Sequence, residues 1–338
     1  PKHEALEVDL DSWKPDAATT STWDAARHDA RMLAGLAARN IEMLARYQSL
    51  QDTTGYVETV PLTPTSPFYS VPQDLRRLYL ADVARRVQGG NRLEQAQAVQ
   101  SLQRDLSLWQ RMLNGEGGLI SKMVAQSYIH ADSAVPLDVI AENAGAWLEP
   151  RPMDDWKIGK VFVSEFRATA QILEEISQER RAFNRWFFLP RATTNAQAEQ
   201  LRALQRLADT EPAAMPQHSL DAKHALDEAA SFPGVLRNPM GKILLRIAVP
   251  AYHEYPLRTF DVAAVQRAVT LAYQIRAQRV AGADVQAFMQ AHPEWSVHPV
   301  GNAQFVWNEE AMELRVPQQS RTRSNQRFSV RVAPVNRA

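Results

Sequence analysis

Apolar residues recur three or four positions apart along most of the chain, which is the spacing of one face of an α-helix. The pattern predicts helices over residues 22–49, 73–88, 91–114, 119–130, 156–188, 194–208, 241–249, 261–280 and 283–290. Asn91 with Glu94, and Thr194 with Gln197, have the spacing of a capping box at a helix start. We therefore expect a mainly α fold of many helices in orthogonal and antiparallel packing.

The apolar period changes near the C-terminus. Phe305 and Trp307, and after a polar turn Met312 and Leu314, alternate with polar residues, which is typical of a β-hairpin. A similar alternation over 328–332 could add a third strand. We expect a small antiparallel β-hairpin or three-stranded sheet whose apolar face packs on the helices, because so small a sheet is marginal alone.

Prolines interrupt the helical pattern and suggest how the chain is organised. Residues 52–72 form a Pro-rich segment with aromatics, either pinned across the core or forming the lip of a binding site. We expect five parts: an irregular lead-in (1–21), a helical body (22–208), a Pro-broken connection (209–237), a second helical part packed on the first (238–300) and a small β element with an Arg-rich tail (301–338).

Composition excludes several classes of protein. The 338 residues are 45% hydrophobic, and 38 basic residues balance 38 acidic ones, so no net charge draws the whole chain to nucleic acid or to an anionic membrane. The chain has no cysteine, which excludes disulfides, thiolate metal sites and cysteine nucleophiles and suits an oxidising compartment. Because it opens at Pro1 rather than at a methionine, we expect that a signal or membrane anchor preceded it.

One segment resembles a known group of proteins. Residues 238–245 read NPMGKILL, and Pro250, Tyr252, Tyr255, Arg258 and a helix from Asp261 follow. Over about residues 238–280 the chain resembles uncharacterised membrane-anchored helical envelope proteins of proteobacteria. The resemblance implies a periplasmic or inner-membrane-anchored ectodomain with another envelope protein as partner. It brings no catalytic residues, and a cytoplasmic location stays open as the alternative.

Asp221, His224 and Glu228 lie three and four positions apart, so a helix would place them on one face. Such a set can bind a metal ion, but the same spacing is typical of a solvated face with paired charges. The second histidine four residues away that zinc-binding helices carry is absent. We expect no metal and no cofactor, and keep these three residues as weak metal candidates.

His253 and Glu254 lie between two prolines in a turn rich in tyrosine. A histidine beside a carboxylate could do general acid–base work, although adjacent residues do not face each other in regular structure. They are the weak catalytic candidates. The glycine-rich residues 115–118 could offer amides to a phosphate, but no Lys-Ser/Thr pair follows, so a helix–helix turn is expected.

Two arginine-rich segments are candidate interfaces. Arg180, Arg181 and Arg185 lead into Trp186, an Arg–aromatic cluster typical of interface anchors and also of an amphipathic helix near its end. The C-terminal tail carries Arg321, Arg323, Arg327 and Phe328. It could touch phosphate, anionic lipid or an acidic partner, or be an edge strand that its charges keep from aggregating.

These observations predict a non-enzymatic protein–protein interaction or scaffolding module of the bacterial envelope. The alternative is a hydrolase or small-ligand-binding protein that uses an inter-helix pocket near His253 and Glu254. A nucleic-acid partner, bound through the C-terminal arginines, is not expected. A membrane contact through an N-terminal anchor remains open.

Overall fold

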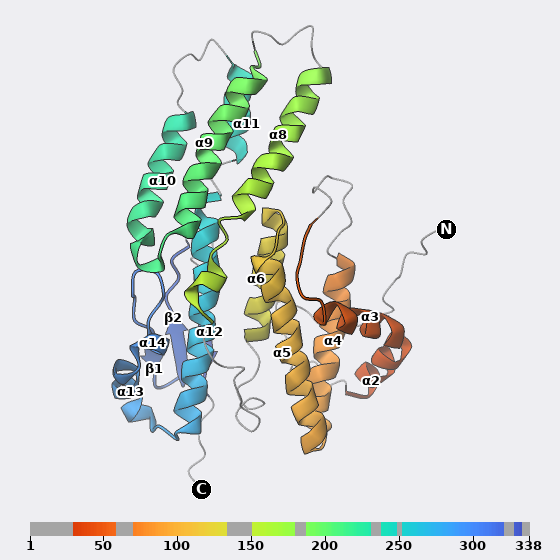
Figure 1. Cartoon of the computed structure of the whole chain (residues 1–338). Coiled ribbons are helices and arrows are strands. Elements are labelled where there is room, and N and C mark those ends of the chain that lie inside the picture. The colour runs from red at the N-terminus through yellow and green to blue at the C-terminus, as the bar shows by residue number, and fades with distance from the viewer. Residues whose placement is uncertain are drawn as a thin grey trace.

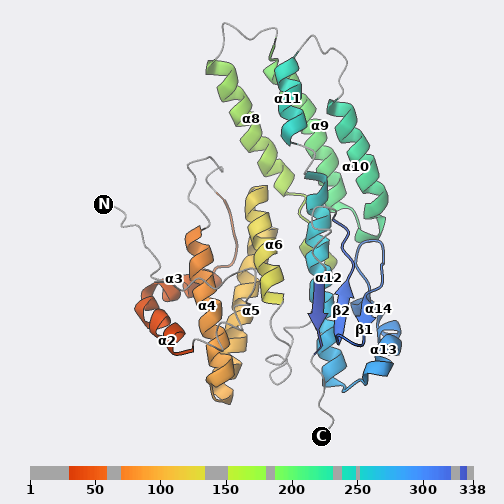
Figure 2. The same cartoon turned by 180° about the vertical axis from the view of Figure 1, so that it is seen from behind.

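The computed structural model describes residues 30–58, 70–133, 151–179, 187–230, 238–248, 252–320 and 328–332. They form helices joined by turns, with one small sheet towards the C-terminus, in an elongated molecule (Figures 1 and 2). The prediction of a mainly α fold with a small antiparallel sheet is confirmed. None of the described helices is long and apolar enough to cross a bilayer.

A first group of helices packs around a shared apolar core (Figure 1). It consists of α2 (Ala30–Arg39), α3 (Ile41–Gln51), α4 (Ser70–Gly89), α5 (Arg92–Asn114) and α6 (Leu119–Ser133). α5 packs against both α4 and α6. The capping box predicted for α5 is confirmed, because Asn91 Oδ1 accepts the Glu94 amide at 3.1 Å and Glu94 Oε2 accepts the Asn91 amide at 2.8 Å.

The single helix predicted over residues 22–49 is wrong in its described part. The chain leaves helical geometry at Asn40 (φ −103°, ψ 23°), which separates α2 from α3. The Asn40 side chain donates to the Leu36 carbonyl at 2.9 Å, so it competes with the backbone in the way that favours turns. Asn40 is itself buried, so the break belongs to the core and not to an exposed loop.

A second group of helices forms the end of the molecule that is uppermost in Figure 1. It consists of α8 (Val161–Glu179), α9 (Pro190–Asp209), η3 (Pro212–Ala214), α10 (Met215–Ala230) and α11 (Pro239–Ala248). The 3-10 helix η2 (Met153–Trp156) precedes α8 and instead contacts α5 and α12. α9 packs against α8, α10 and α11. The helix predicted from residue 156 thus begins only at Val161, and its description ends at Glu179.

Two expectations about prolines in this group are wrong. Pro190 begins α9 instead of ending the helix before it, and the N-cap is Leu189, so Thr194 is an interior residue and no capping residue. Proline suits the first helical turn because that position needs no amide donor. The Pro-broken connection 209–237 contains the helix α10, in which Pro216 likewise falls in the first turn.

The long helix α12 (Tyr255–Ala277) packs against α6 of the first group and against the sheet, and the short helix just before it contacts α9 and α10 of the second group. α12 is preceded by η4 (Tyr252–Glu254) and followed by η5 (Gly282–Asp284), α13 (Val285–Ala291) and α14 (Pro293–Ser296). It starts earlier than the predicted residue 261, because Pro256 occupies its first turn. Gln126 of α6 donates to the Thr259 hydroxyl, a bond between residues far apart in the sequence.

The C-terminal sheet is antiparallel in the order β1-β2-β3, with β1 (Val306–Asn308), β2 (Glu313–Val316) and β3 (Phe328–Arg331). Leu314 is the register partner of both Trp307 and Val330, so these three share one face. That face lies towards α12, which contacts β2 and β3. The other face carries the exposed Val306 and Arg331, as the alternation predicts.

The apolar side chains of the sheet are not buried to the extent expected. Phe305 and Leu314 are fully buried, at 2% and 0% exposed. Trp307 and Met312, which we expected on the face packed against the helices, are only partly buried. Met312 belongs to the turn before β2 and has a positive φ of 49°. The anchor of the sheet is therefore the pair Phe305 and Leu314.

Candidate functional site

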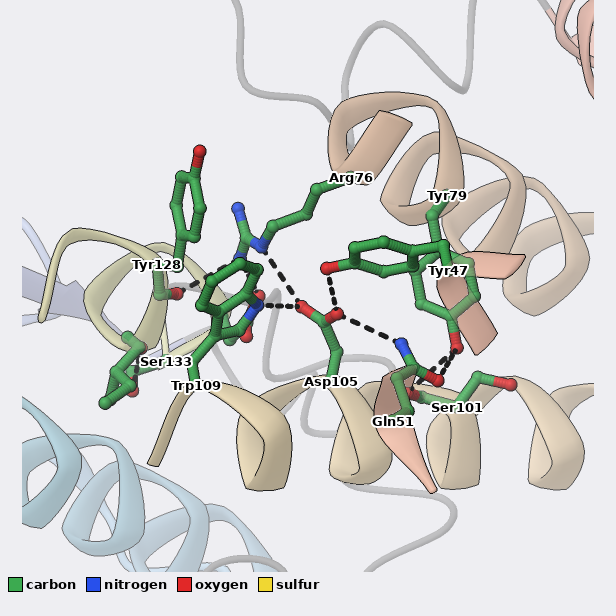
Figure 3. Close-up of polar contacts among 11 residues, drawn as sticks. Tyr47, Gln51, Arg76, Tyr79, Ser101, Asp105, Trp109, Tyr128 and Ser133 are labelled. Atoms are coloured by element: carbon green, nitrogen blue, oxygen red, sulfur yellow. Dashed lines mark hydrogen bonds and ion pairs between the residues drawn. The ribbon is translucent and has the colours of Figure 1, made fainter. Parts of the chain in front are cut away.

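The largest group of buried charges that the described residues form lies among α3, α4, α5 and α6 (Figure 3). Its centre is Asp105, which is 0% exposed. Asp105 Oδ1 accepts the Tyr47 hydroxyl at 2.6 Å and Gln51 Nε2 at 3.1 Å. Oδ2 accepts Arg76 Nε and Trp109 Nε1, both at 3.1 Å. One carboxylate thereby connects three helices, and we call this group the polar centre.

Arg76 extends the polar centre to α6. Its Nη2 donates to Asp132 Oδ1 and, at 3.1 Å, to the Tyr128 carbonyl. Its guanidinium lies 4.3 Å from the centre of the Tyr128 ring and 5.9 Å from that of Trp109, so both ring faces meet a cation. A buried arginine with this many partners has its charge and its donors largely satisfied.

The polar centre holds one buried cation beside two buried carboxylates, and their proximity shifts the pKa values of Arg76 and Asp132. Although burial disfavours the cation, the two carboxylates hold the pKa of Arg76 above its ordinary value. Burial raises the pKa of Asp132 well above its ordinary value, and the nearby Asp105 adds to this while Arg76 opposes it. The Oδ2 atom of Asp132 has no hydrogen-bond partner in the described part of the chain. Folding therefore favours the protonated form of Asp132 over its charged form.

Two buried tyrosines complete the polar centre beside Gln51. The Tyr79 hydroxyl donates towards Gln51 Oε1 and the Ser101 carbonyl, each at 3.1 Å. The Tyr47 and Tyr79 rings lie 5.2 Å apart (Figure 3). Burial raises the pKa of Tyr47 and of Tyr79, so both phenols stay protonated donors. With Arg76 and Asp105 also excluded from solvent, the polar centre is built to hold helices together and offers no group to an outside substrate.

A second buried carboxylate fixes the C-terminal region to α12. Asp261 Oδ1 accepts His298 Nε2 at 3.1 Å and the Gln319 amide at 2.9 Å, and Oδ2 accepts the Ser320 amide at 3.2 Å and hydroxyl at 2.6 Å. His298 Nδ1 lies 3.0 Å from the Val300 amide nitrogen and 3.1 Å from the Val300 carbonyl oxygen, so both ring nitrogens have partners. Burial alone would raise the pKa of Asp261, but these hydrogen bonds lower it.

Ser320, His298 and Asp261 are the residue types of a catalytic triad, but their order is different. In a triad the histidine lies between the serine and the acid, so that it can take the proton of the serine. Here the carboxylate lies between the other two, and Ser320 Oγ donates to Asp261 Oδ2. The arrangement therefore holds the chain in place, and we call it the C-terminal clasp.

The glycine-rich turn before α6 uses its amides internally. The Gly118 amide donates to Glu58 Oε2 at 2.7 Å and the Leu119 amide to Glu165 Oε1 at 2.6 Å. Lys122 donates to the carbonyls of Met112 and Gly115, and burial lowers its pKa to about 8. Two carboxylates thus occupy the places where a phosphate would bind, and the helix–helix turn expected here is what the structure shows.

The two catalytic candidates are neighbours in one short helix. His253 and Glu254 fall in η4, where Glu254 is 9% exposed and its Oε2 lies 3.7 Å from Arg258 Nη2. The Arg258 guanidinium in turn lies 4.6 Å from the centre of the Tyr255 ring. Glu254 thus faces along α12 towards Arg258.

The remaining sequence candidates are placed only in part. On α10 Asp221 and His224 are exposed, while the Glu228 side chain lies outside the described residues. Within the described ranges no three His, Asp or Glu side chains come together to hold a metal ion. Of the interface candidates, only the backbone of Phe328 is described, paired with Val316 in the sheet. The others, which are Arg180, Arg181, Arg185, Trp186, Arg321, Arg323 and Arg327, lie outside the described residues.

An open cavity of about 770 Å³ lies between α9 and α10. Its polar lining includes Arg206, Thr210 and His218. It could admit a small polar ligand, but neither His253 nor Glu254 lines it. The pocket that the enzymatic alternative requires is therefore not this one.

The residues of the polar centre did not emerge from the sequence as a site. A usable signal was present: Asp105 lies on the apolar stripe of its helix, three residues after Leu102 and four before Trp109. A charged residue in such a position is almost always paired when buried. Nothing in the pattern names the partner, because Arg76 and Asp132 come from other helices.

No family model matches this chain, and no curated protein and no solved structure matches it either. Its function is therefore argued from its own residues.

Proposed function

We propose that this protein is a non-enzymatic interaction module, and that it binds a partner protein by adding a strand of the partner to the outer edge of β3. The resemblance of residues 238–280 to envelope proteins supports an envelope protein as the partner. The burial of the polar centre and the clasp supports a scaffold, because both use their charges to fix helices and strands.

The observation that carries the proposal is the direction of the amides in β3. The Val332 amide donates to the Met312 carbonyl at 2.8 Å, so this amide points towards β2. Amides alternate in direction along a strand. The amides and carbonyls of Ser329 and Arg331 therefore point away from β2, and in the described part of the chain no strand pairs with them. Such an edge can accept an extended segment of another protein.

The edge is held firmly enough to act as a template. β3 contacts α12, and Val332, which follows it, is 1% exposed. Ser320, shortly before β3, is bound in the C-terminal clasp. Deleting residues 318–338 would remove both attachments, so it would disturb the fold as well as the edge. A test has to change the edge alone.

Ser329→Pro makes that change, because proline removes an outward amide and leaves the bonds to β2 in place. Ser329→Ala is the matched control: it loses only the hydroxyl, which bonds to Glu313, and keeps the amide. Each tagged protein is incubated with an extract of the cells that produce it, and the captured proteins are compared. We expect a protein that the wild type and Ser329→Ala capture and Ser329→Pro does not.

Equal capture by Ser329→Pro, or capture of nothing by the wild type, would contradict the proposal. Thermal unfolding of all three proteins checks that the sheet survives each change. Val330→Pro serves as the positive control for damage, since the amide of Val330 faces β2.

A further inference from the structure

Four large apolar side chains are exposed at the end of the molecule where α9 and α11 begin (Figures 1 and 2). They are Phe187 (56% exposed), Leu189 (37%), Met240 (36%) and Ile243 (58%), and we call them the tip patch. Exposed apolar side chains that are single need no explanation, but a contiguous group usually marks a binding surface.

Hydrogen bonds hold the two halves of the tip patch together. The Met240 amide donates to the Phe187 carbonyl at 3.1 Å, and the Leu189 amide donates to Asn238 Oδ1 at 2.9 Å. Asn238 Nδ2 also donates to Thr193 Oγ1 at 3.0 Å, which ties the start of α11 to the first turns of α9. The patch is therefore a built surface with a fixed shape.

α11 presents its apolar residues to both sides. Gly241 and Leu245 face inward and are buried. Met240, Ile243 and Arg246 follow one another at intervals of three residues and form an outward stripe that is apolar at one end and cationic at the other. A helix with a buried inner face and such an outer face is typical of a segment that lies in the surface of a membrane.

The two segments that carry the tip patch have charges of one sign. Residues 187–195 and 238–248 contain Arg191, Lys242 and Arg246 and no acidic residue, although the whole chain is neutral. Acidic residues belong to the rest of the helices packed with them, such as Glu199 on α9 and Asp221 on α10. Cations around an exposed apolar group complement a surface that offers acyl chains beneath anionic headgroups.

We propose that the tip patch docks on an anionic lipid bilayer, with Ile243 and its apolar neighbours entering the headgroup region and Arg191 and Arg246 contacting lipid phosphates. An acidic protein surface would use the cations but would leave the four apolar side chains without a comparable environment. This proposal is independent of the edge of β3, which belongs to a different part of the molecule.

Vesicle co-sedimentation tests the proposal. The purified chain is mixed with vesicles of phosphatidylcholine containing about one third phosphatidylglycerol, and with vesicles of phosphatidylcholine alone. We expect binding to the anionic vesicles that weakens as salt rises, and little binding to the neutral ones. Ile243→Asp, and separately Arg191→Glu with Arg246→Glu, should each weaken the binding at least about tenfold.

Matched controls lie far from the tip patch. Leu93→Asp changes an apolar residue on α5 that is 67% exposed, and Arg46→Glu with Arg104→Glu reverses two exposed cations of the first helical group. These variants should bind as the wild type does. Absence of wild-type binding to anionic vesicles, or equal weakening by the controls, overturns the proposal. If Ile243→Asp fails to fold, the variant with both arginines replaced decides the test. Ser329→Pro, which changes only the edge of β3, should bind vesicles as the wild type does.

Discussion

Asp105 and Asp132 lie beside the same guanidinium, yet their hydrogen bonding differs. Asp105 accepts four hydrogen bonds, from Tyr47, Gln51, Arg76 and Trp109. Asp132 is equally buried, but one of its oxygens lacks a partner among the described residues. At the scale of single residues, the two acids should respond differently to loss of charge.

Replacing Asp132 by Asn should change the dependence of stability on pH. The pKa of Asp132 is raised on folding, so between its unfolded value of about 3.9 and its higher folded value the native state holds a proton that the unfolded chain releases. The stability from this group is complete below about pH 3.9 and is lost as pH rises through that window. The free energy of unfolding of Asp132→Asn, relative to wild type, should therefore rise with pH by up to about 1.4 kcal/mol per pH unit within the window.

Asp105→Asn is the matched opposite case. An amide has one acceptor oxygen and cannot receive four donors, and its neutral form leaves Arg76 without its ion-pair partner. We expect a loss of about 3–5 kcal/mol, as for breaking a buried ion pair. Urea unfolding of both variants between pH 4 and 8 measures the difference. Equal destabilisation by the two asparagines at neutral pH would contradict the difference expected between the two acids.

At the scale of elements, the spacing of apolar residues predicted most of the helices, whereas prolines and close helix contacts were harder to interpret. The helical period gave the right class and most of the helices, because it reports which face is buried. Prolines were misassigned where they begin a helix, as Pro190 does, since a break and a start look alike in the pattern. Close approaches between helices also stayed hidden, because they depend on which residue of another helix lies opposite.

Gly241→Ala should destabilise the start of α11, and Gly35→Ala should not harm α2. A Cβ on Gly241 would lie 2.2 Å from Thr193 Oγ1 and 2.4 Å from both polar atoms of the Asn238 side chain, whereas one on Gly35 meets nothing within 4 Å. Alanine favours a free helical position over glycine by about 1 kcal/mol. We expect a lower melting temperature for the first variant and an unchanged or higher one for the second. A stable Gly241→Ala protein would mean that α11 is not tightly docked on α9.

The whole molecule depends on attachments to α12 that the sequence does not reveal. His298 precedes Pro299, a pattern that is typical of a turn, but its ring is 0% exposed and bound to Asp261. The sheet itself was predictable from its alternation, whereas its placement was not, because the clasp joins residues that are distant in the chain. The same holds for the bond between Gln126 and Thr259.

Asp261→Asn should loosen the C-terminal region while leaving the helical groups folded. The variant keeps the size of the side chain but cannot accept the bonds from His298, Gln319 and Ser320 together. Because hydrogen bonds lower the pKa of Asp261 on folding, the clasp stabilises the protein above about pH 3.9 and weakens as pH falls through the lowered value. Limited trypsin digestion at neutral pH should cleave the variant near its C-terminus faster than His292→Ala, a control in the half-buried stack on Trp295. Equal cleavage rates would contradict this role of the clasp.

The position of α12 in the chain also has a consequence for synthesis. Every helix from α2 to α11 leaves the ribosome before Tyr255 does, and α2 to α6 pack largely against their neighbours in sequence, so they can fold as they emerge. The face of α6 that carries Gln126, by contrast, packs against α12, which follows much later in the chain. A nascent chain paused just before Tyr255 would lack this contact, and is the stage at which a chaperone has most to protect.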